Sequence, residues 1–266
     1  MKTVLTIAGS DSCGGAGIQA DLKTISALCA YGMSAITAVT AQNTMGVLSV
    51  RELDVDIIRD QINCLYDDIV VDAVKVGMVS SIEIIDVIGE CLQKNRAVNI
   101  VVDPVMVSKS GYHLLRAEAR ETLIKVLFPL AEVVTPNLYE AELLTGDKIE
   151  TLAQMEQAAL KIHGLGGSKV IVKGGHLTGD AIDVVYDGEN LSYLKGKRIE
   201  TKNTHGTGCT FSSAIAALLA RGYPLPEAAR QAKKYINGAI GHSLTLGNGA
   251  GPVNHFYSLY QKAGCL

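Results

Sequence analysis

The chain has 266 residues, of which 48% are hydrophobic and 19% charged, and it contains no tryptophan. This length suits one large α/β domain over residues 1–266, and the composition is that of a globular, not a disordered, protein. The net charge of −3 comes without any basic block, which disfavours nucleic acid and membrane surfaces as partners.

The cysteines and the N-terminal residues favour a reducing compartment. The six cysteines are scattered, with no CxxC pair and no Cys/His cluster at zinc spacing. The sequence shows no signal-peptide pattern and no apolar run of 18 or more residues. We therefore expect a cytoplasmic protein with reduced thiols.

The first predicted strand, Val4–Ala8, leads into a glycine-rich loop and a helix over Ile18–Ala30. Gly15-x-Gly17-x-x-Ala20 formally matches a dinucleotide-binding fingerprint. That fingerprint also needs an acid about 20 residues later to bind a ribose, and the sequence has no Asp or Glu between Leu22 and Arg51. We expect the loop to form a wall of another small-molecule site, with a plain tight turn as the alternative.

The middle of the chain alternates between predicted strands and helices. The expected strands are 34–41, 71–76, 98–102, 132–134 and 169–172. The expected helices are 55–66, 81–94, 117–126, one that starts within 135–140, and 149–163. An Asp-Gly turn predicts a hairpin of strands 181–186 and 191–194. Helices over 207–221, 225–239 and 253–260 then finish the chain. This order predicts a three-layer α/β/α domain with a mostly parallel sheet.

Polar residues follow several of the predicted strands. Asp103 comes directly after one strand, and Lys173, which could neutralise phosphate charge or be an ordinary surface lysine, follows another. Asn137 and Glu140 share a helix face, as a capping pair or as ligands of magnesium phosphate through water. Gln42 can offer both a donor and an acceptor, which suits an aminopyrimidine edge, but carboxamides also occur in simple turns.

The stretch Gly206-Thr207-Gly208-Cys209 runs into an Ala-rich helix, with Phe211, Ile215, Leu218 and Leu219 on one predicted buried face. Unpaired N–H groups at such a helix start bind anions, and glycines allow close approach. The same field would favour the thiolate form of Cys209. The alternative is a plain helix cap with a buried cysteine.

These features converge on one edge of the predicted sheet, because parallel strands end at the same side. The residues expected there are Gly9, Gln42, Met78, Asp103, Asn137 and Lys173. A neutral organic ligand near Gln42, with phosphate near Lys173 and the helix start, follows from this arrangement. The sequence lacks the P-loop, HExxH and G-x-S-x-G patterns, which excludes P-loop phosphoryl transfer and disfavours zinc proteases and α/β-hydrolases.

Several motifs, in order, resemble those of the ribokinase-like superfamily. The motifs are Ala8–Ser12, Gly14–Asp21, Asp103–Met106, Thr135–Asn137 with Glu140, Lys173–His176 and Thr204–Cys209. Within that superfamily they are similar to the hydroxymethylpyrimidine (phosphomethylpyrimidine) kinases of thiamine biosynthesis, over nearly the whole chain. The resemblance implies a ribokinase-like fold, ATP and Mg²⁺ as cofactors, and a homodimer. It implies phosphorylation of 4-amino-5-hydroxymethyl-2-methylpyrimidine and then of its monophosphate.

The resemblance also implies roles for individual residues. The expected pyrimidine pocket is lined by Gly9, Asp21, Gln42, Met78 and Val105. Asp103, Asn137 and Glu140 are expected to organise magnesium and phosphate, with Asp103 and Glu140 acting on the metal through water. Lys173 would touch the transferring phosphate, and the turn Gly206, Thr207, Gly208 and Cys209 would stabilise transition-state charge.

Cys209 separates branches of the superfamily, since its sugar kinases carry an aspartate base at this position. Cysteine therefore argues against a sugar substrate. A pyridoxal kinase of the same cysteine-bearing type is the nearest rival, because both substrates are flat heterocycles with a hydroxymethyl group. Gln42 favours the aminopyrimidine. A non-catalytic vitamin or nucleotide sensor on this fold is the alternative from another class.

Overall fold

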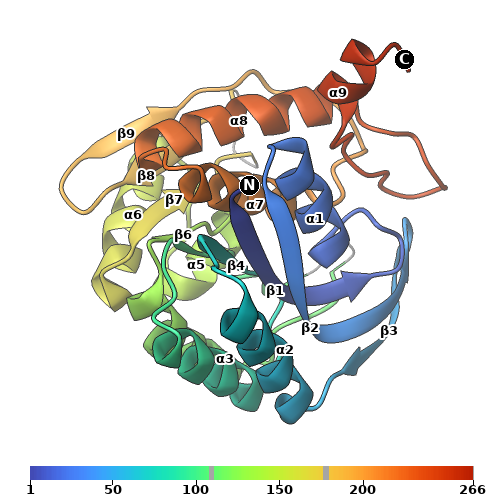
Figure 1. Ribbon diagram of the computed structural model, residues 1–266. Coiled ribbons are helices and arrows are strands. Elements are labelled where there is room, and N and C mark those ends of the chain that lie inside the picture. Colours follow the sequence, from blue (N-terminus) through green and yellow to red (C-terminus); the bar gives the residue numbers. More distant parts are fainter. Residues whose placement is uncertain (108–110, 176–179, 266) are drawn as a thin grey trace.

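A nine-stranded sheet runs through the computed structural model, which describes residues 1–107, 111–175 and 180–265 (Figure 1). The strand order is β3-β2-β1-β4-β5-β6-β7-β8-β9. The strands are β1 (Thr3–Asp11), β2 (Tyr31–Asn43), β3 (Gly46–Glu52), β4 (Ala73–Val76), β5 (Ile100–Val102), β6 (Val133–Val134), β7 (Lys169–Val172), β8 (Asp183–Tyr186) and β9 (Leu191–Leu194). The six strands from β2 to β7 in this order are parallel, and β3, β8 and β9 join the two edges antiparallel.

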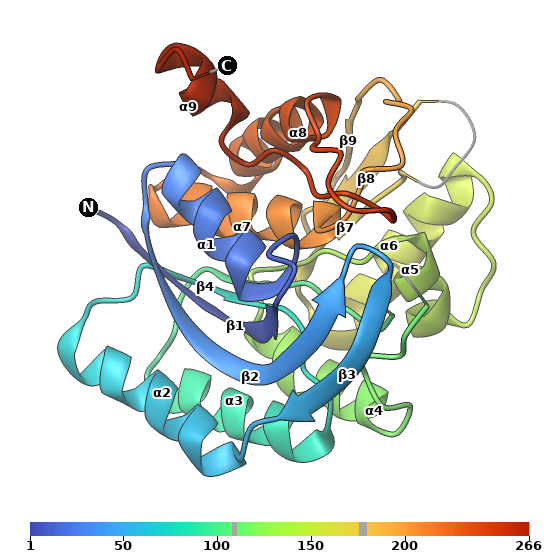
Figure 2. The same cartoon turned by 90° about the vertical axis from the view of Figure 1, so that its right-hand side faces the viewer.

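Helices cover both faces of the sheet (Figures 1 and 2). One face carries α1 (Gly17–Ala27), α7 (Thr207–Ala220) and α8 (Leu225–Gly241), with the short α9 (Tyr257–Lys262) beyond α8. The other face carries α2 (Val55–Asp68), α3 (Ile82–Lys94), α4 (Ala119–Thr122), α5 (Leu138–Thr145) and α6 (Leu152–Gly166). A π-helical turn (Leu123–Leu127) and a 3-10 turn (Phe128–Leu130) continue α4. The predicted three-layer α/β/α fold with a mostly parallel sheet is confirmed.

The central strands are apolar on both sides because each side faces helices. Along β5, Val101 points into the core beneath α7 and α8, whereas Val102 points into the core beneath α2 to α6. Helix α7 lies between the sheet, α1 and α8, so every residue from Thr210 to Ala220 is buried. The predicted buried face of α7 is therefore correct, and small side chains let the remaining faces pack closely as well.

Strand β3 is the main element that the sequence pattern did not predict. It pairs antiparallel with β2 after a tight turn in which Asn43 Oδ1 accepts hydrogen bonds from the N–H groups of Met45 and Gly46. Its side chains are mostly half-buried or exposed, as Leu48 is 87% exposed. A strand with so little burial carries a weak hydrophobic pattern and depends on its partner for its conformation.

No helix in the described ranges is long and apolar enough to cross a membrane.

Candidate functional site

The strand ends bring the predicted polar residues to one edge of the sheet. Gly9 lies near the end of β1 and Gln42 near the end of β2, while Met78, Asp103 and Lys173 follow β4, β5 and β7. All of these strands are parallel, so their carboxyl ends lie together. Asn137 joins them through a bridge to Lys173. His176, part of one sequence motif, lies outside the described residues.

The glycine-rich starts of α1 and α7 touch each other at this edge. Gly206 has φ +79°, and a Cβ atom there would lie 1.7 Å from the carbonyl oxygen of Gly15. Gly17 has φ +53°, and its Cβ would lie 2.3 Å from the carbonyl oxygen of Gly9. Glycine is required at both positions, because any side chain would meet backbone atoms in a conformation that is already unfavourable for it.

A buried ion pair joins the ends of β5 and β7. Lys173 Nζ lies 2.8 Å from Asp103 Oδ1, and Asp103 also accepts hydrogen bonds from Thr135 and Ser212. Burial alone would raise the pKa of Asp103, but the ammonium groups of Lys173 and Lys75 hold that pKa below its usual range. Burial likewise opposes the charge of Lys173, whose pKa is nevertheless raised by Asp103 and Glu140. Both groups are therefore ionised at neutral pH.

Helix α7 begins against this ion pair. A Cβ atom on Gly208 would lie 3.4 Å from Lys173 Nζ and 3.5 Å from Asp103 Oδ2. The N–H groups of the first turn of an α-helix have no acceptor within the helix and concentrate positive potential there. The turn Gly206 to Cys209, called the anion-binding turn below, thus presents N–H groups beside a buried ammonium group. This arrangement suits a phosphate.

Asn137 and Glu140 form a capping box at the start of α5. The Asn137 side chain accepts from the Glu140 N–H at 2.9 Å, and Glu140 Oε2 accepts from the Asn137 N–H at 2.7 Å. The capping interpretation is confirmed. Burial, together with the nearby charge of Asp103, raises the pKa of Glu140 to about 7, although Lys173 opposes the shift. Glu140 therefore titrates in the neutral range beside Asp103 and Lys173.

The structure corrects the expectation that Cys209 favours its thiolate form. Burial raises the pKa of Cys209 to about 11, and the carboxylates of Asp21 and Asp103 add to the shift. The ammonium group of Lys75 and a hydrogen bond from the backbone of Gly17 oppose it, but they do not outweigh the loss of hydration. Cys209 is a neutral thiol at pH 7, because the effect of a helix start is smaller than that of desolvation here.

The residues expected around a pyrimidine fall into two groups. Gly9 and Met78 are in contact, since a Cβ on Gly9 would lie 2.8 Å from the Met78 sulfur, and half-buried Val105 follows Asp103 at the same edge. Asp21 differs, because it is fully buried and its carboxylate is hydrogen-bonded to Thr6 and other groups below the edge. The structure therefore places Asp21 beneath the site and not on its wall.

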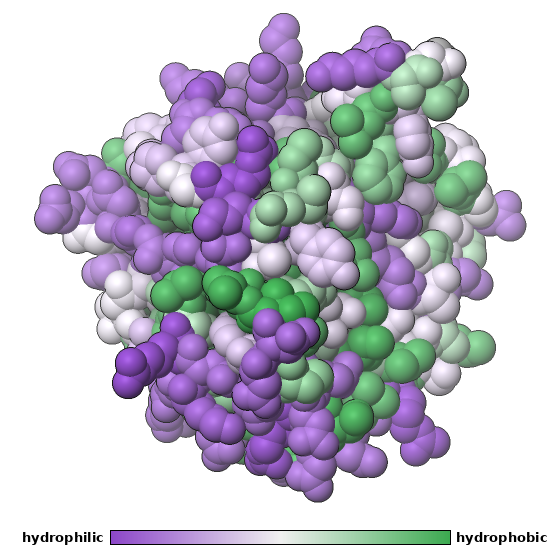
Figure 3. Space-filling view, viewed as in Figure 1, coloured by the Kyte–Doolittle hydropathy of each residue, from purple (hydrophilic) through white to green (hydrophobic). Residues whose placement is uncertain are grey.

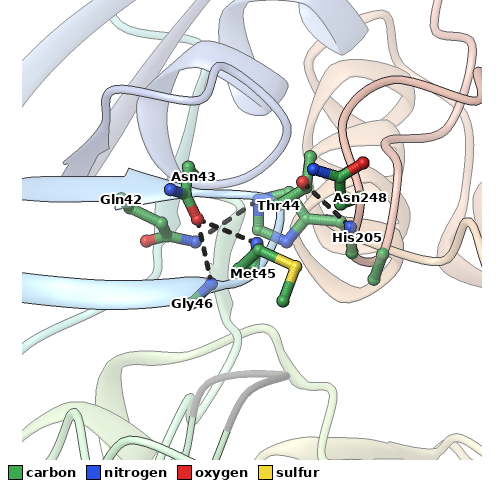
Figure 4. Close-up of a pocket in the computed structure, with 9 residues that line it drawn as sticks. Gln42, Asn43, Thr44, Met45, Gly46, His205 and Asn248 are labelled. Carbon is green, nitrogen blue, oxygen red and sulfur yellow. Dashed lines mark hydrogen bonds between the residues drawn. The ribbon is translucent and has the colours of Figure 1, made fainter.

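A cavity of about 220 Å³ lies beside Gln42, between the β2–β3 turn and the loop that contains residues 248–250 (Figure 4). Its lining residues are Gln42, Asn43, Thr44, Met45, Gly46, His205, Asn248, Gly249 and Ala250. Gln42 Nε2 lies 3.4 Å from His205 Nε2, which lies 2.8 Å from Asp11 Oδ2. Gln42 is thus connected to the residue that immediately precedes the anion-binding turn.

Two polar residues at the site, Asp11 and Lys75, have no role predicted from the sequence pattern. Asp11 accepts hydrogen bonds from the N–H groups of Cys13, Gly15 and Ala16 and so shapes the glycine-rich loop. Lys75 is fully buried in β4. A lysine within the apolar run Val74–Val76 was a signal in the sequence, since a buried lysine requires a partner.

Comparison with known proteins gives consistent matches. The family model described as phosphomethylpyrimidine kinase matches residues 11–254. A hydroxymethylpyrimidine/phosphomethylpyrimidine kinase from Rhizobium meliloti is 53% identical over 259 residues, covering 95% of this chain and 96% of the relative. The thiamine biosynthesis bifunctional protein ThiED of Geobacter sulfurreducens is 51% identical over 254 residues, or 95% of this chain. The chain spans about half of that relative, at 52% of its length.

The solved structures include a similar protein with a different stated activity. The crystal structure of an ADP complex of Bacillus subtilis pyridoxal kinase matches with a TM-score of 0.90 and 44% sequence identity, covering 96% of this chain and 98% of that one. The fold and the buried ion pair at the anion-binding turn are consistent with these matches. The chain belongs to the phosphomethylpyrimidine kinase family.

Proposed function

We propose that this protein is a kinase that transfers the γ-phosphoryl group of ATP to the hydroxymethyl oxygen of 4-amino-5-hydroxymethyl-2-methylpyrimidine. It then phosphorylates the monophosphate to the diphosphate, as a step of thiamine biosynthesis. In each step a new O–P bond forms, the bond from the β–γ bridging oxygen to the γ-phosphorus breaks, and ADP leaves. In the first step the acceptor hydroxyl also loses its proton, which is released to water. The observation that carries this proposal is the position of the Asp103–Lys173 ion pair beside Gly208, in the space next to the anion-binding turn that a side chain there would enter.

The proposed chemistry depends on positioning and electrostatic stabilisation. Lys173 and the N–H groups of the anion-binding turn would hold the transferring phosphoryl group, where charge develops on its oxygens. Phosphoryl transfer passes through a loose transition state, so the acceptor hydroxyl needs orientation more than early deprotonation. A neutral Cys209 thiol suits this role, because it can hydrogen-bond to the hydroxyl without first losing its own proton.

The proposed substrate wall consists of Gly9, Gln42, Met78 and Val105, with Asp21 acting from beneath. Gly9 lets the Met78 sulfur approach the backbone of β1, an approach that any side chain at this position would obstruct. Gln42 can pair its amide with a ring nitrogen and an amino group together. This donor and acceptor pair is the feature that favours an aminopyrimidine.

The carboxyl groups of Asp103 and Glu140 suit a magnesium ion, which prefers oxygen ligands and retains water. Asp103 is already engaged by Lys173, Thr135 and Ser212, so we expect it to reach the metal through water. Magnesium would neutralise charge on the ATP phosphates. Asn137 and Lys173 would orient those phosphates from the same side.

The experiment that tests the function is an ADP-release assay with purified protein, ATP and Mg²⁺. We expect turnover with hydroxymethylpyrimidine and with its monophosphate, and its loss in Lys173→Met. Turnover of pyridoxal with neither pyrimidine accepted would instead establish a pyridoxal kinase, the second candidate, which the similarity to the B. subtilis enzyme favours. The absence of ADP release with all three acceptors would contradict both functions and favour a sensor.

We also infer a homodimer that forms through the β2–β3 hairpin. β3 is the outermost strand of the sheet, and Val39, Met45 and Leu48 are 46%, 66% and 87% exposed. Figure 3 shows groups of hydrophobic side chains among hydrophilic ones. Some of these hydrophobic groups lie on the right-hand side, where Figure 1 shows β3. Light scattering of Leu48→Lys tests this inference, and a monomeric wild-type protein would contradict it.

The proposed location is the cytoplasm. The six cysteines are free thiols in the structure, which suits a reducing compartment.

A further inference from the structure

Lys75 is a fully buried lysine in a strand whose other residues are apolar. It lies in β4 between Val74 and Val76, directly opposite Thr6 in the register with β1. Its Nζ lies 3.1 and 2.9 Å from the two carboxylate oxygens of Asp21, which is also fully buried. Burying two charges is costly, and such a pair is weak evidence for stability. A role of the pair in positioning nearby elements, or in setting the local electrostatic field, therefore has to be considered.

The ion pair lies one helical turn below Cys209. Asp21 follows Gly17 by four residues on α1, and Ser213 follows Cys209 by four residues on α7, so each pair shares a helix face. The backbone of Gly17 lies close enough to the Cys209 sulfur to lower the pKa of the thiol, and the Ser213 hydroxyl donates to Asp21 Oδ1 at 2.7 Å. Two successive contacts thus join the starts of α1 and α7, and the lower one includes the carboxylate of the ion pair.

The backbone around Lys75 is shaped to admit its ammonium group. A Cβ atom on Gly77 would lie 2.5 Å from Lys75 Nζ, so the lysine occupies the space that a side chain there would need. Thr6 donates to Asp21 Oδ2 at 2.7 Å from the neighbouring strand. The carboxylate therefore accepts from three different elements: β1, β4 and α7.

Charged groups from four elements act on the Cys209 thiol. Lys75 from β4 favours its ionised form, whereas Asp21 from α1 and Asp103 after β5 oppose it. Lys173, which follows β7, also interacts with Cys209. Among these groups Lys75 is the strongest one that favours the ionised form.

We propose that the Lys75–Asp21 ion pair is a positioning device that fixes α7 against α1 beneath the anion-binding turn and imposes its electrostatic field on Cys209. Lys75 and Asp21 act through Cys209 and the anion-binding turn and do not touch the substrate. The effect on turnover rests on the proposed kinase function. The effect on the reactivity of the Cys209 thiol does not depend on that function. A failure of this proposal can therefore be distinguished from a failure of the proposed kinase function.

The test measures the alkylation rate of Cys209 by iodoacetamide at pH 8.5, resolved from the other cysteines by mass spectrometry of the peptides. Asp21→Asn retains hydrogen-bonding atoms for Thr6 and Ser213 but leaves Lys75 without its counter-charge. We expect its alkylation to be about tenfold faster, because a change of one pKa unit changes the thiolate fraction tenfold in this range. Lys75→Met combined with Asp21→Asn removes both charges and should react several-fold more slowly than the wild type.

The double variant keeps the test valid if a single change prevents folding, since it leaves no unpaired buried charge. The matched control is a largely buried Lys–Asp pair outside the anion-binding turn, Lys233 with Asp183, joined at 2.7 Å. Lys233→Met combined with Asp183→Asn should leave the Cys209 rate within twofold of the wild type. Rates within twofold of the wild type in both Asp21 variants would overturn the electrostatic role.

Ser213→Ala separates positioning from charge. It breaks the lower contact between α1 and α7 without changing any charged group. We expect a lower kcat with a nearly unchanged KM for the pyrimidine and an unaltered pH dependence of the Cys209 alkylation rate. An unchanged kcat in Ser213→Ala would overturn the positioning role.

Discussion

Lys173 Nζ lies 2.8 Å from Asp103 Oδ1, a contact that joins two strand ends 70 residues apart in the sequence. The side chain of Lys173 is 16% exposed and that of Asp103 2% exposed, so the pair is largely shielded from water. The ammonium group is held in place by Asp103 before any phosphate arrives. Such preorganisation avoids the cost of ordering a flexible lysine during the reaction.

Lys173→Met should reduce kcat about 100-fold, because it removes a group that stabilises charge on the transferring phosphoryl oxygens. It should also lower the free energy of unfolding by about 3 kcal/mol, because Asp103 would remain buried without the counter-charge that is hydrogen-bonded to it. ADP release and urea unfolding measure the two effects. Lys125→Met is the control, since Lys125 forms an exposed pair with Glu121 and should behave like the wild type. A fully active Lys173→Met would contradict the proposed phosphate contact.

Cys209→Ala and Cys209→Ser distinguish a neutral thiol from a thiolate base. Because burial raises the pKa of Cys209 to about 11, the thiol is protonated at pH 7. Serine also carries a protonated hydroxyl, so Cys209→Ser should retain about tenfold more turnover than Cys209→Ala, the equivalent of one hydrogen bond. Equal losses in the two variants would favour a thiolate base, and full activity of Cys209→Ala would remove the residue from the mechanism.

Gln42→Met should weaken the aminopyrimidine more than pyridoxal. The expected increase in KM for hydroxymethylpyrimidine is about tenfold, since methionine cannot supply the donor and acceptor that the amide provides. Pyridoxal, measured side by side, provides the comparison. Equal changes for the two acceptors would show that Gln42 does not determine the choice between them.

Gly206→Ala should be far more harmful than Gly222→Ala, although both glycines have positive φ angles, +79° and +88°. A Cβ on Gly222 meets nothing within 4 Å, so we expect only the conformational cost of about 1–2 kcal/mol. A Cβ on Gly206 would lie 1.7 Å from the Gly15 carbonyl oxygen and must also displace α1 from α7. Urea unfolding of the two variants gives the difference, and similar losses would show that the α1–α7 contact is not tight.

Glu140→Gln should alter the pH dependence of stability. Burial raises the pKa of Glu140 from its ordinary 4.5 to about 7, so the folded protein favours the protonated acid. Its contribution to stability is complete below pH 4.5 and is lost as the pH rises through 7. The wild type should therefore lose stability relative to Glu140→Gln between these values, while the glutamine preserves the cap.

Unfolding measured from pH 4.5 to 8 tests this expectation. Glu142→Gln is the control, because hydrogen bonding from the Ile149 N–H lowers the pKa of Glu142 and no loss should occur in that range. A constant difference between wild type and Glu140→Gln across the range would contradict the raised pKa of Glu140.

The sequence was sufficient to predict the strands and helices that have a clear local pattern of apolar residues. Apolar runs such as Val98–Val102 and Lys169–Val172 predict strands by themselves, although β5 begins only at Ile100 and Val98 is exposed. The ends of these two strands locate Asp103 and Lys173 at the same edge. β3 could not be predicted in this way, because its conformation depends on pairing with β2 more than on its own pattern.

The site was predictable in its composition but not in its electrostatics. The partner of Lys75 lies 54 residues away in the sequence, and only the fold brings Asp21 to it. The thiol of Cys209 shows the same limit, since a helix start is a local feature whereas its desolvation results from packing by several elements. Local sequence therefore indicated which residues gather at the site, and tertiary packing determines their protonation.

The protonation of Cys209 has a consequence for the durability of the protein under oxidising conditions. Peroxide attacks thiolates, and a thiol whose pKa is about 11 is ionised in only about one molecule in ten thousand at pH 7. The exposed Cys29, Cys64 and Cys265 are the thiols that an oxidant reaches first. A site built on a neutral thiol can thus keep a cysteine at its centre and still resist the sulfenic acid formation that inactivates low-pKa cysteine enzymes.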